Sequence, residues 1–294
     1  MRGLTDLAAT PAALALCAAA CFGLALVLTQ FGLRHLSPRQ GAAVSISTTA
    51  LLFWLLAPLA LDLGAWDGRA VAIFLALGLL FPAAVTLLTF EANRRMGPSG
   101  SGALGNLAPL FAVALAAPAL GEAPDWLQTA AIATILIGVA ALSVDRRWLD
   151  TSWPYWAAGL PIAAAAIRGF VQPVMKLGLA LWPSPFAAAL AGYTVSAIVV
   201  AGAVARGPGA PSGALRRPGA AWFAVVGICN GTAVVAMYAA LARGSVVVVA
   251  PLVATYPLVT LLLAAVLWRN TPTTLPQVVG VALTVLGAAA LIAD

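Results

Sequence analysis

The chain has 294 residues, of which 63% are hydrophobic and only 8% are charged, and its mean hydropathy is +1.02. A soluble domain carries about 25% charged residues, so this chain cannot cover a water-facing surface and is expected to lie in a lipid bilayer. The net charge of +6 is spread over the connections without a basic run, which argues against a nucleic-acid partner.

Glycines, prolines and charged residues divide the chain into ten apolar segments, and a spanning helix needs about 20 residues. The segments are expected to be helices, because a helix satisfies its backbone hydrogen bonds internally in lipid. The continuous apolar runs do not suit the alternating strands of a membrane barrel. In chain order the expected helices are 11–33, 41–61, 70–90, 99–119, 126–144, 154–181, 185–205, 219–241, 245–268 and 275–293.

A segment in the first half of the chain is echoed in the second half. The stretch 105–122 resembles 253–270 at a constant offset of 148 residues, and this offset pairs Pro109 with Pro257. The pattern predicts two five-helix repeats, over residues 1–150 and 151–294. Because five is an odd number, the second repeat enters the membrane from the opposite side, an inverted arrangement that recurs in transporters.

The order of the segments, the charged turn at 94–99 and the stretch LAPLFAVALAAPALGE at 107–122 resemble the drug/metabolite transporter superfamily, above all its EamA-type exporters. The family's Gly-Glu pair at the end of the fourth helix is present as Gly121-Glu122, whereas the second repeat has Arg269-Asn270. The resemblance implies ten transmembrane helices around a central cavity between the repeats. It also implies export of small metabolites, with amino-acid and aromatic amino-acid exporters among the members, and a multi-pass place in a bacterial inner membrane.

Three polar residues are expected on one face of the sixth segment. Arg168, Gln172 and Lys176 follow one another at intervals of four residues, so they share a helix face that should avoid lipid. Arg168 is expected to bind a substrate carboxylate with two hydrogen bonds. The alternatives are that Arg168 pairs with an acid or backbone carbonyls, and that Lys176 extends to the membrane interface.

Other polar and aromatic residues lie inside the apolar segments and suit a binding site with apolar walls and a few fixed polar groups. Helix packing is the alternative role for such residues. Pro109 and Pro257 are expected to bend the fourth and ninth helices as hinges, although membrane helices also tolerate proline without a special role. The further candidate binding residues are Asn106, Asn230, Tyr193, Tyr238, Tyr256 and Trp54.

The acidic and metal-binding residues favour a carrier without a coupling ion. A proton- or sodium-coupled carrier usually places a carboxylate within the membrane, and Glu91 is the deepest carboxylate here, which keeps a proton-coupled mechanism as the alternative. One histidine, His35, and three cysteines give no zinc motif. We therefore expect no metal, no cofactor and no enzymatic activity, the rival being a membrane enzyme that acts on lipids.

The expected function is export of amino acids or similar small metabolites, by facilitated diffusion or exchange. Drugs, nucleosides and other metabolites are the alternative cargoes. The expected partners are the substrate and the bilayer, and no obligate protein partner is evident.

The orientation of the chain is open, because two criteria disagree. The positive-inside rule places the connections with Arg34, Arg39, Arg146, Arg147, Arg206, Arg216, Arg217 and Arg269 in the cytoplasm, against Arg2, Arg69 and Arg243 on the other side. Both termini would then lie outside, whereas the family resemblance implies that both lie inside.

Overall fold

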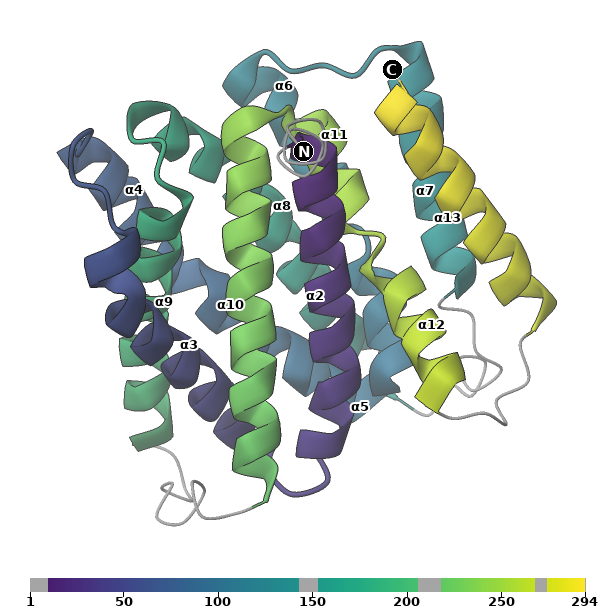
Figure 1. Cartoon of the computed structure of the whole chain (residues 1–294). Helices are drawn as coiled ribbons and strands as arrows, with labels where there is room; N and C mark the ends of the chain where they lie inside the picture. The colour runs from purple at the N-terminus through teal and green to yellow at the C-terminus, as the bar shows by residue number, and fades with distance from the viewer. Residues whose placement is uncertain (1–9, 143–152, 206–217, 268–273, 294) are drawn as a thin grey trace.

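The computed structural model describes residues 10–142, 153–205, 218–267 and 274–293, and these residues form helices and connections without a strand (Figure 1). The elements are α2 (Pro11–Gly32), α3 (Pro38–Ala60), α4 (Gly68–Gly78), the π-helix η1 (Leu79–Ala84), α5 (Val85–Gly105), α6 (Ala108–Leu120), α7 (Trp126–Leu142), the 3-10 helix η3 (Tyr155–Ala158), α8 (Gly159–Leu181), α9 (Pro185–Ala205), α10 (Gly219–Arg243), α11 (Val246–Val253), α12 (Tyr256–Leu267) and α13 (Leu275–Ala293).

Several helices begin at residues that satisfy the free N–H groups of a first turn. The side chain of Thr10 accepts a hydrogen bond at the start of α2, Asp67 accepts two at the start of α4, and Ser245 accepts one at the start of α11. Ser37 and Gln40 form a capping box for α3. These polar caps fix where the chain leaves an apolar segment and turns back.

Eight helical segments in the described ranges are long and apolar enough to cross a membrane. Three of them are composite: Gly68–Ala92 joins α4, η1 and part of α5, Tyr155–Leu181 joins η3 and α8, and Val246–Leu263 joins α11 and part of α12. The shorter apolar helices α6 and α7 occupy the places of the expected fourth and fifth spans. The number of ten spans therefore stays a prediction.

One expected boundary is wrong. A charged turn was expected at 94–99, but α5 continues through these residues, and the helix breaks at Asn106 and Leu107 instead. After the break α6 begins at Ala108, and Pro109 is its second residue. Proline has no N–H to donate, and its ring clashes with the carbonyl of the residue four positions earlier, so α5 cannot continue through Pro109. The proline therefore marks the break, and the glycines and charges before it do not.

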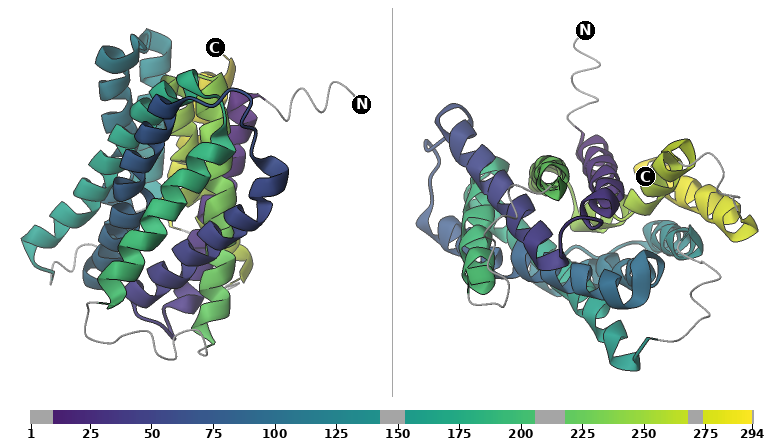
Figure 2. Two further views of the ribbon diagram at one scale, coloured as in Figure 1. Left: turned by 90° about the vertical axis from the view of Figure 1, so that its left-hand side faces the viewer. Right: turned by 90° about the horizontal axis from the view of Figure 1, so that it is seen from below.

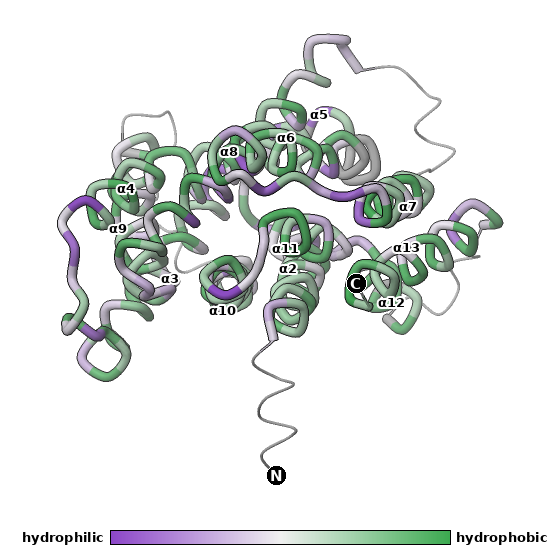
Figure 3. Tube along the Cα trace, turned by 90° about the horizontal axis from the view of Figure 1, so that it is seen from above, coloured by the Kyte–Doolittle hydropathy of each residue, from purple (hydrophilic) through white to green (hydrophobic). Residues whose placement is uncertain are grey.

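The helices form two groups that face each other across the molecule, and each group draws on both halves of the chain. In the first group α2 packs against α10, α11 and α12, and in the second α8 packs against α4, α5 and α6. Figure 3 shows α5, α6 and α8 on one side and α2, α10 and α12 on the other, with mainly hydrophobic residues along both. At the two edges, α3 packs on α9 and α7 packs on α13, and both views of Figure 2 show the long helices side by side.

The described chain ends lie on one face of the bundle, which we call the terminal face. Figure 1 shows the start of α2 and the end of α13 at the upper end, together with the α6–α7 and α10–α11 connections. Arg69 and Arg243 belong to this face, and Arg34 and Arg39 belong to the opposite face, where α2 leads into α3. The other arginines of the charge comparison lie outside the described residues, and they are Arg2, Arg146, Arg147, Arg206, Arg216, Arg217 and Arg269.

The edge pair α7 and α13 is held by contact between backbones. A Cβ atom added to Gly138 would lie 2.6 Å from the backbone nitrogen of Thr284, and one added to Gly280 would lie 2.7 Å from the carbonyl oxygen of Gly138. Small residues of this kind let membrane helices approach closely, since lipid offers no hydrophobic drive for association.

We therefore predict that Gly138→Leu destabilises the protein by about 1–3 kcal/mol, because backbone atoms cannot move aside for the new side chain. Thermal unfolding of the purified protein in detergent measures the loss. The control is Ala140→Leu, which adds the same side chain on the exposed side of α7. Equal losses in the two variants would contradict the close-packing account.

Candidate functional site

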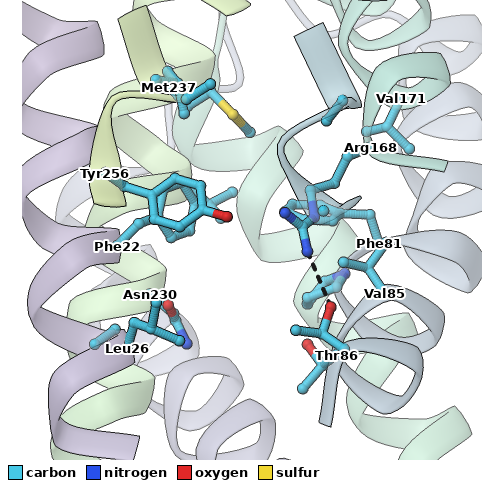
Figure 4. Close-up of a pocket in the computed structure, with 18 of the residues that line it drawn as sticks. Phe22, Leu26, Phe81, Val85, Thr86, Arg168, Val171, Asn230, Met237 and Tyr256 are labelled. Atoms are coloured by element: carbon cyan, nitrogen blue, oxygen red, sulfur yellow. Dashed lines mark hydrogen bonds between the residues drawn. The ribbon is translucent and has the colours of Figure 1, made fainter. Parts of the chain in front are cut away.

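A cavity of about 170 Å³ lies between the two helix groups, near the middle of the bundle. Its walls come from α2 and α10 to α12 on one side and from η1, α5, α6 and α8 on the other, with α3 and α9 at the edge. Figure 4 shows side chains from both groups pointing into this space. Residues of both halves of the chain therefore line a single site.

Three helix breaks border the cavity. Phe81 has extended backbone angles inside the third span, and the other two breaks fall at Asn106–Leu107 and at Ala254–Thr255. The offset of 148 residues found in the sequence relates the last two breaks, which precede Pro109 and Pro257 respectively. Irregular backbone at membrane depth is tolerated where it is buried in protein or lines a cavity, and transporters often place their sites at such interruptions.

The break at Phe81 is satisfied by a neighbouring helix. The hydroxyl of Ser196 on α9 donates to the carbonyl oxygen of Gly78 at 2.6 Å and accepts from the N–H of Ala83 at 3.1 Å. Ser196 is fully buried. One side chain thus replaces backbone hydrogen bonds that the interruption removes, and it attaches α9 to the broken span.

The cavity carries a positive charge, and the described residues of its lining include no carboxylate. The guanidinium of Arg168 donates from Nη2 to the hydroxyl of Thr89 at 3.0 Å. Figure 4 shows the hydroxyl of Tyr256 and the guanidinium of Arg168 pointing toward each other from opposite walls. Among the described residues, the ion pairs are those of Glu91 with Arg95 and of Glu122 with Lys176, so Arg168 keeps donors for a bound anion.

Amide side chains supply further polar groups to the same cavity. Gln172 and Asn106 line it and are 6% and 5% exposed, and Asn230 lines it from α10. The Oε1 atom of Gln172 is buried without a hydrogen-bond partner in the described part of the chain. A buried amide oxygen in this state is costly unless a water or a ligand bonds it.

The structure brings seven of the candidate residues into the cavity lining. They are Asn106, Pro109, Arg168, Gln172, Tyr193, Asn230 and Tyr256.

Four candidates lie elsewhere. Trp54 is 56% exposed and donates to the hydroxyl of Thr194 at 3.1 Å. Tyr238 is 2% exposed and does not line the cavity, and Pro257 follows the break without contributing to the lining. Lys176 pairs with Glu122 beyond the cavity.

The partners of Glu122 keep its carboxylate charged. Burial alone raises the pKa of Glu122, but hydrogen bonds from Lys176, Ser245 and the N–H of Val246 outweigh it and hold the pKa below its ordinary value of 4.5. The carboxylate therefore stays ionised at neutral pH.

Several wall residues could not be named from the sequence. Phe22, Phe81, Thr29 and Met237 line the cavity, but in so apolar a chain a residue that faces a cavity looks like one that faces lipid. The available signals were the proline after Phe81 and the hydroxyl of Thr29, which hydrogen-bonds to the backbone of its own helix. No group of three or more metal-ligating side chains occurs within the described ranges.

The comparisons with known proteins agree with this architecture. A crystal structure of another protein matches with a TM-score of 0.70 at 18% sequence identity, over 95% of this chain and 94% of the other. Identity this low supports the fold alone. No curated protein matches the chain.

The model of the EamA-like transporter family matches residues 10–144 and again residues 155–293. One match falls in each half of the chain, and together they cover nearly all of the described helices. The multi-pass apolar architecture and the cavity between two helix groups suit a membrane transporter of small molecules. The chain belongs to the EamA-like transporter family.

Proposed function

We propose that this transporter exports amino acids with apolar or aromatic side chains across a bacterial inner membrane. The observation that carries the proposal is the pairing of one accessible cation with an apolar, aromatic cavity. Arg168 supplies charge-assisted donors for a carboxylate, and Tyr256 faces it across the space. Phe22 and Phe81 provide walls for an apolar side chain.

The charge of the lining favours a cargo with one carboxylate. A nucleotide would call for several cations to hold its phosphates, and Lys176, the other basic residue of this helix face, is paired with Glu122. An ammonium group must then be held by neutral oxygens, for which the amides of Gln172 and Asn230 are available. The site suits a zwitterion or a monoanion.

Alternating access is the proposed mechanism, with ten spans arranged as two inverted repeats. Supporting observations are the two repeat-related breaks before Pro109 and Pro257 and the packing of each helix group from both halves. We propose that these breaks act as hinges, because a helix end can absorb a change in backbone angles that a continuous helix cannot.

Transport is proposed to be uncoupled from ions. Among the described residues no carboxylate lines the cavity, and Glu91 accepts a hydrogen bond from Arg95 at 2.6 Å on the same helix. Counterflow of labelled amino acids in proteoliposomes should therefore proceed equally with and without a pH gradient. Flux that requires the gradient would instead support proton coupling.

Arg168 is predicted to dominate recognition of the carboxylate. A hydrogen bond to a charged group contributes about 1.5–3 kcal/mol, so Arg168→Met should weaken apparent substrate affinity about 10- to 100-fold. Arg168→Lys should retain part of it, and Arg69→Met, at the exposed start of α4, is the matched control. The decarboxylated amine of a transported amino acid should not compete; competition by that amine would contradict the assignment.

Tyr256 is predicted to make a smaller contribution through its hydroxyl. Tyr256→Phe keeps the ring and removes one neutral hydrogen bond, worth about 0.5–1.5 kcal/mol. Substrate affinity in the counterflow assay should fall by about 2- to 10-fold. Tyr238→Phe makes the same change at a buried tyrosine outside the cavity lining, and an equal loss there would remove the special role of Tyr256.

A further inference from the structure

A cluster of hydrogen bonds at the terminal face joins the two helix groups. The carboxylate of Glu122, in the α6–α7 connection, accepts from the hydroxyl of Ser245 at 2.8 Å and from the N–H of Val246 at 2.7 Å. Lys176 on α8 donates from Nζ to Glu122 and, at 2.6 Å, to the carbonyl oxygen of Gly244. We call these five residues the terminal clasp.

Some bonds of the clasp lie within one helix group and others cross to the second group. Glu122 and Lys176 belong to the group of α5, α6 and α8, and their ion pair lies within that group. The bonds to Gly244, Ser245 and Val246 cross to the α10–α11 turn of the other group. The ion pair of one helix group therefore makes hydrogen bonds to the α10–α11 turn of the other group.

The bonds of the clasp are partly shielded from water. The side chains of Lys176 and Glu122 are 23% and 19% exposed, so their interactions are screened less than those of a surface pair. A carboxylate with several donors also makes charge-assisted bonds, which are stronger than neutral ones. The clasp is therefore suited to hold this end of the bundle shut.

Buried residues of α11 lie between the clasp and the part of the cavity lining that α11 contributes. Val246, Val247 and Val249 of α11 are buried between the two, at 0–2% exposure. On α2 and α5, the lining stretches Phe22–Thr29 and Val85–Phe90 lie toward the opposite face. Along the chain, this packed apolar layer follows the clasp residue Ser245, begins at the clasp residue Val246 and precedes the lining residue Ala250.

We propose that the terminal clasp is the gate that closes the substrate cavity on the face of the two termini. The inference rests on the proposed alternating access. Opening on this side must move the α10–α11 turn away from α8, and this movement breaks the bonds to Gly244, Ser245 and Val246. Lys176, two turns from Arg168 on the same face of α8, then becomes a second cation beside the exit path.

The gate can be tested by the accessibility of a cavity residue to a thiol reagent that does not cross membranes. The background is the full chain with Cys17→Ala, Cys21→Ala and Cys229→Ala, the three cysteines of the sequence. Ala250→Cys then reports from the α11 wall of the cavity, with Val253→Cys as a second position. Proteoliposomes are labelled from each face, and a cleavable tag at the N-terminus identifies the orientation.

Glu122→Gln and Lys176→Met should each raise the labelling rate from the terminal face by about 5-fold or more, the lower end of typical coupling between sites. The double variant should act like the single variants, because both remove the same clasp. Glu91→Gln is the matched control, since it breaks the ion pair with Arg95 elsewhere in the protein. Labelling from the terminal face should stay at the starting rate in this control.

Two outcomes overturn the gate. Unchanged labelling from the terminal face in both single variants would show that the clasp does not close the cavity. Faster labelling from both faces would show general loosening, which thermal unfolding of the same variants would register. Labelling needs no substrate, so the proposed gate and the proposed substrate are tested separately. If the clasp variants change labelling as expected but no amino acid shows counterflow, only the proposed substrate is refuted.

Discussion

The hydrogen-bonding demand of the backbone in an apolar medium is the constraint on which this structure depends. A helix meets the demand by itself, so any interruption must be covered by a neighbour or must face a polar space. The breaks at Phe81, Asn106–Leu107 and Ala254–Thr255 all border one cavity. The cavity therefore lies where the helices are interrupted, and the positions of the prolines decide where these interruptions fall.

The two cations of α8 illustrate how context decides the role of a charge. Arg168 and Lys176 lie on one helix face, two turns apart. Lys176 is neutralised by Glu122 and a backbone carbonyl, whereas Arg168 has a hydroxyl as its described partner. A half-buried charge with incomplete pairing is costly, so such a residue is retained where a ligand completes its hydrogen bonds.

The sequence was sufficient for the membrane class, for most helix positions and for the polar face of α8, because hydropathy and a spacing of four residues are local properties. It was insufficient for the turn expected at 94–99, where local charges and glycines suggested a break that the fold places at Asn106. It also could not separate Trp54, which is exposed, from Tyr256, which lines the cavity. That distinction depends on which helices become neighbours, and this information lies in distant parts of the chain.

The interleaving of the two helix groups has a consequence for assembly during synthesis. The principal partner of α2 is α10, so α2 waits in the membrane for a segment that begins at Gly219. Likewise α7 waits for α13, which begins only at Leu275. The first half alone exposes its close-packing faces to lipid, and contacts between segments so distant in sequence form slowly. The bundle must therefore close in a late step, after both halves have been inserted.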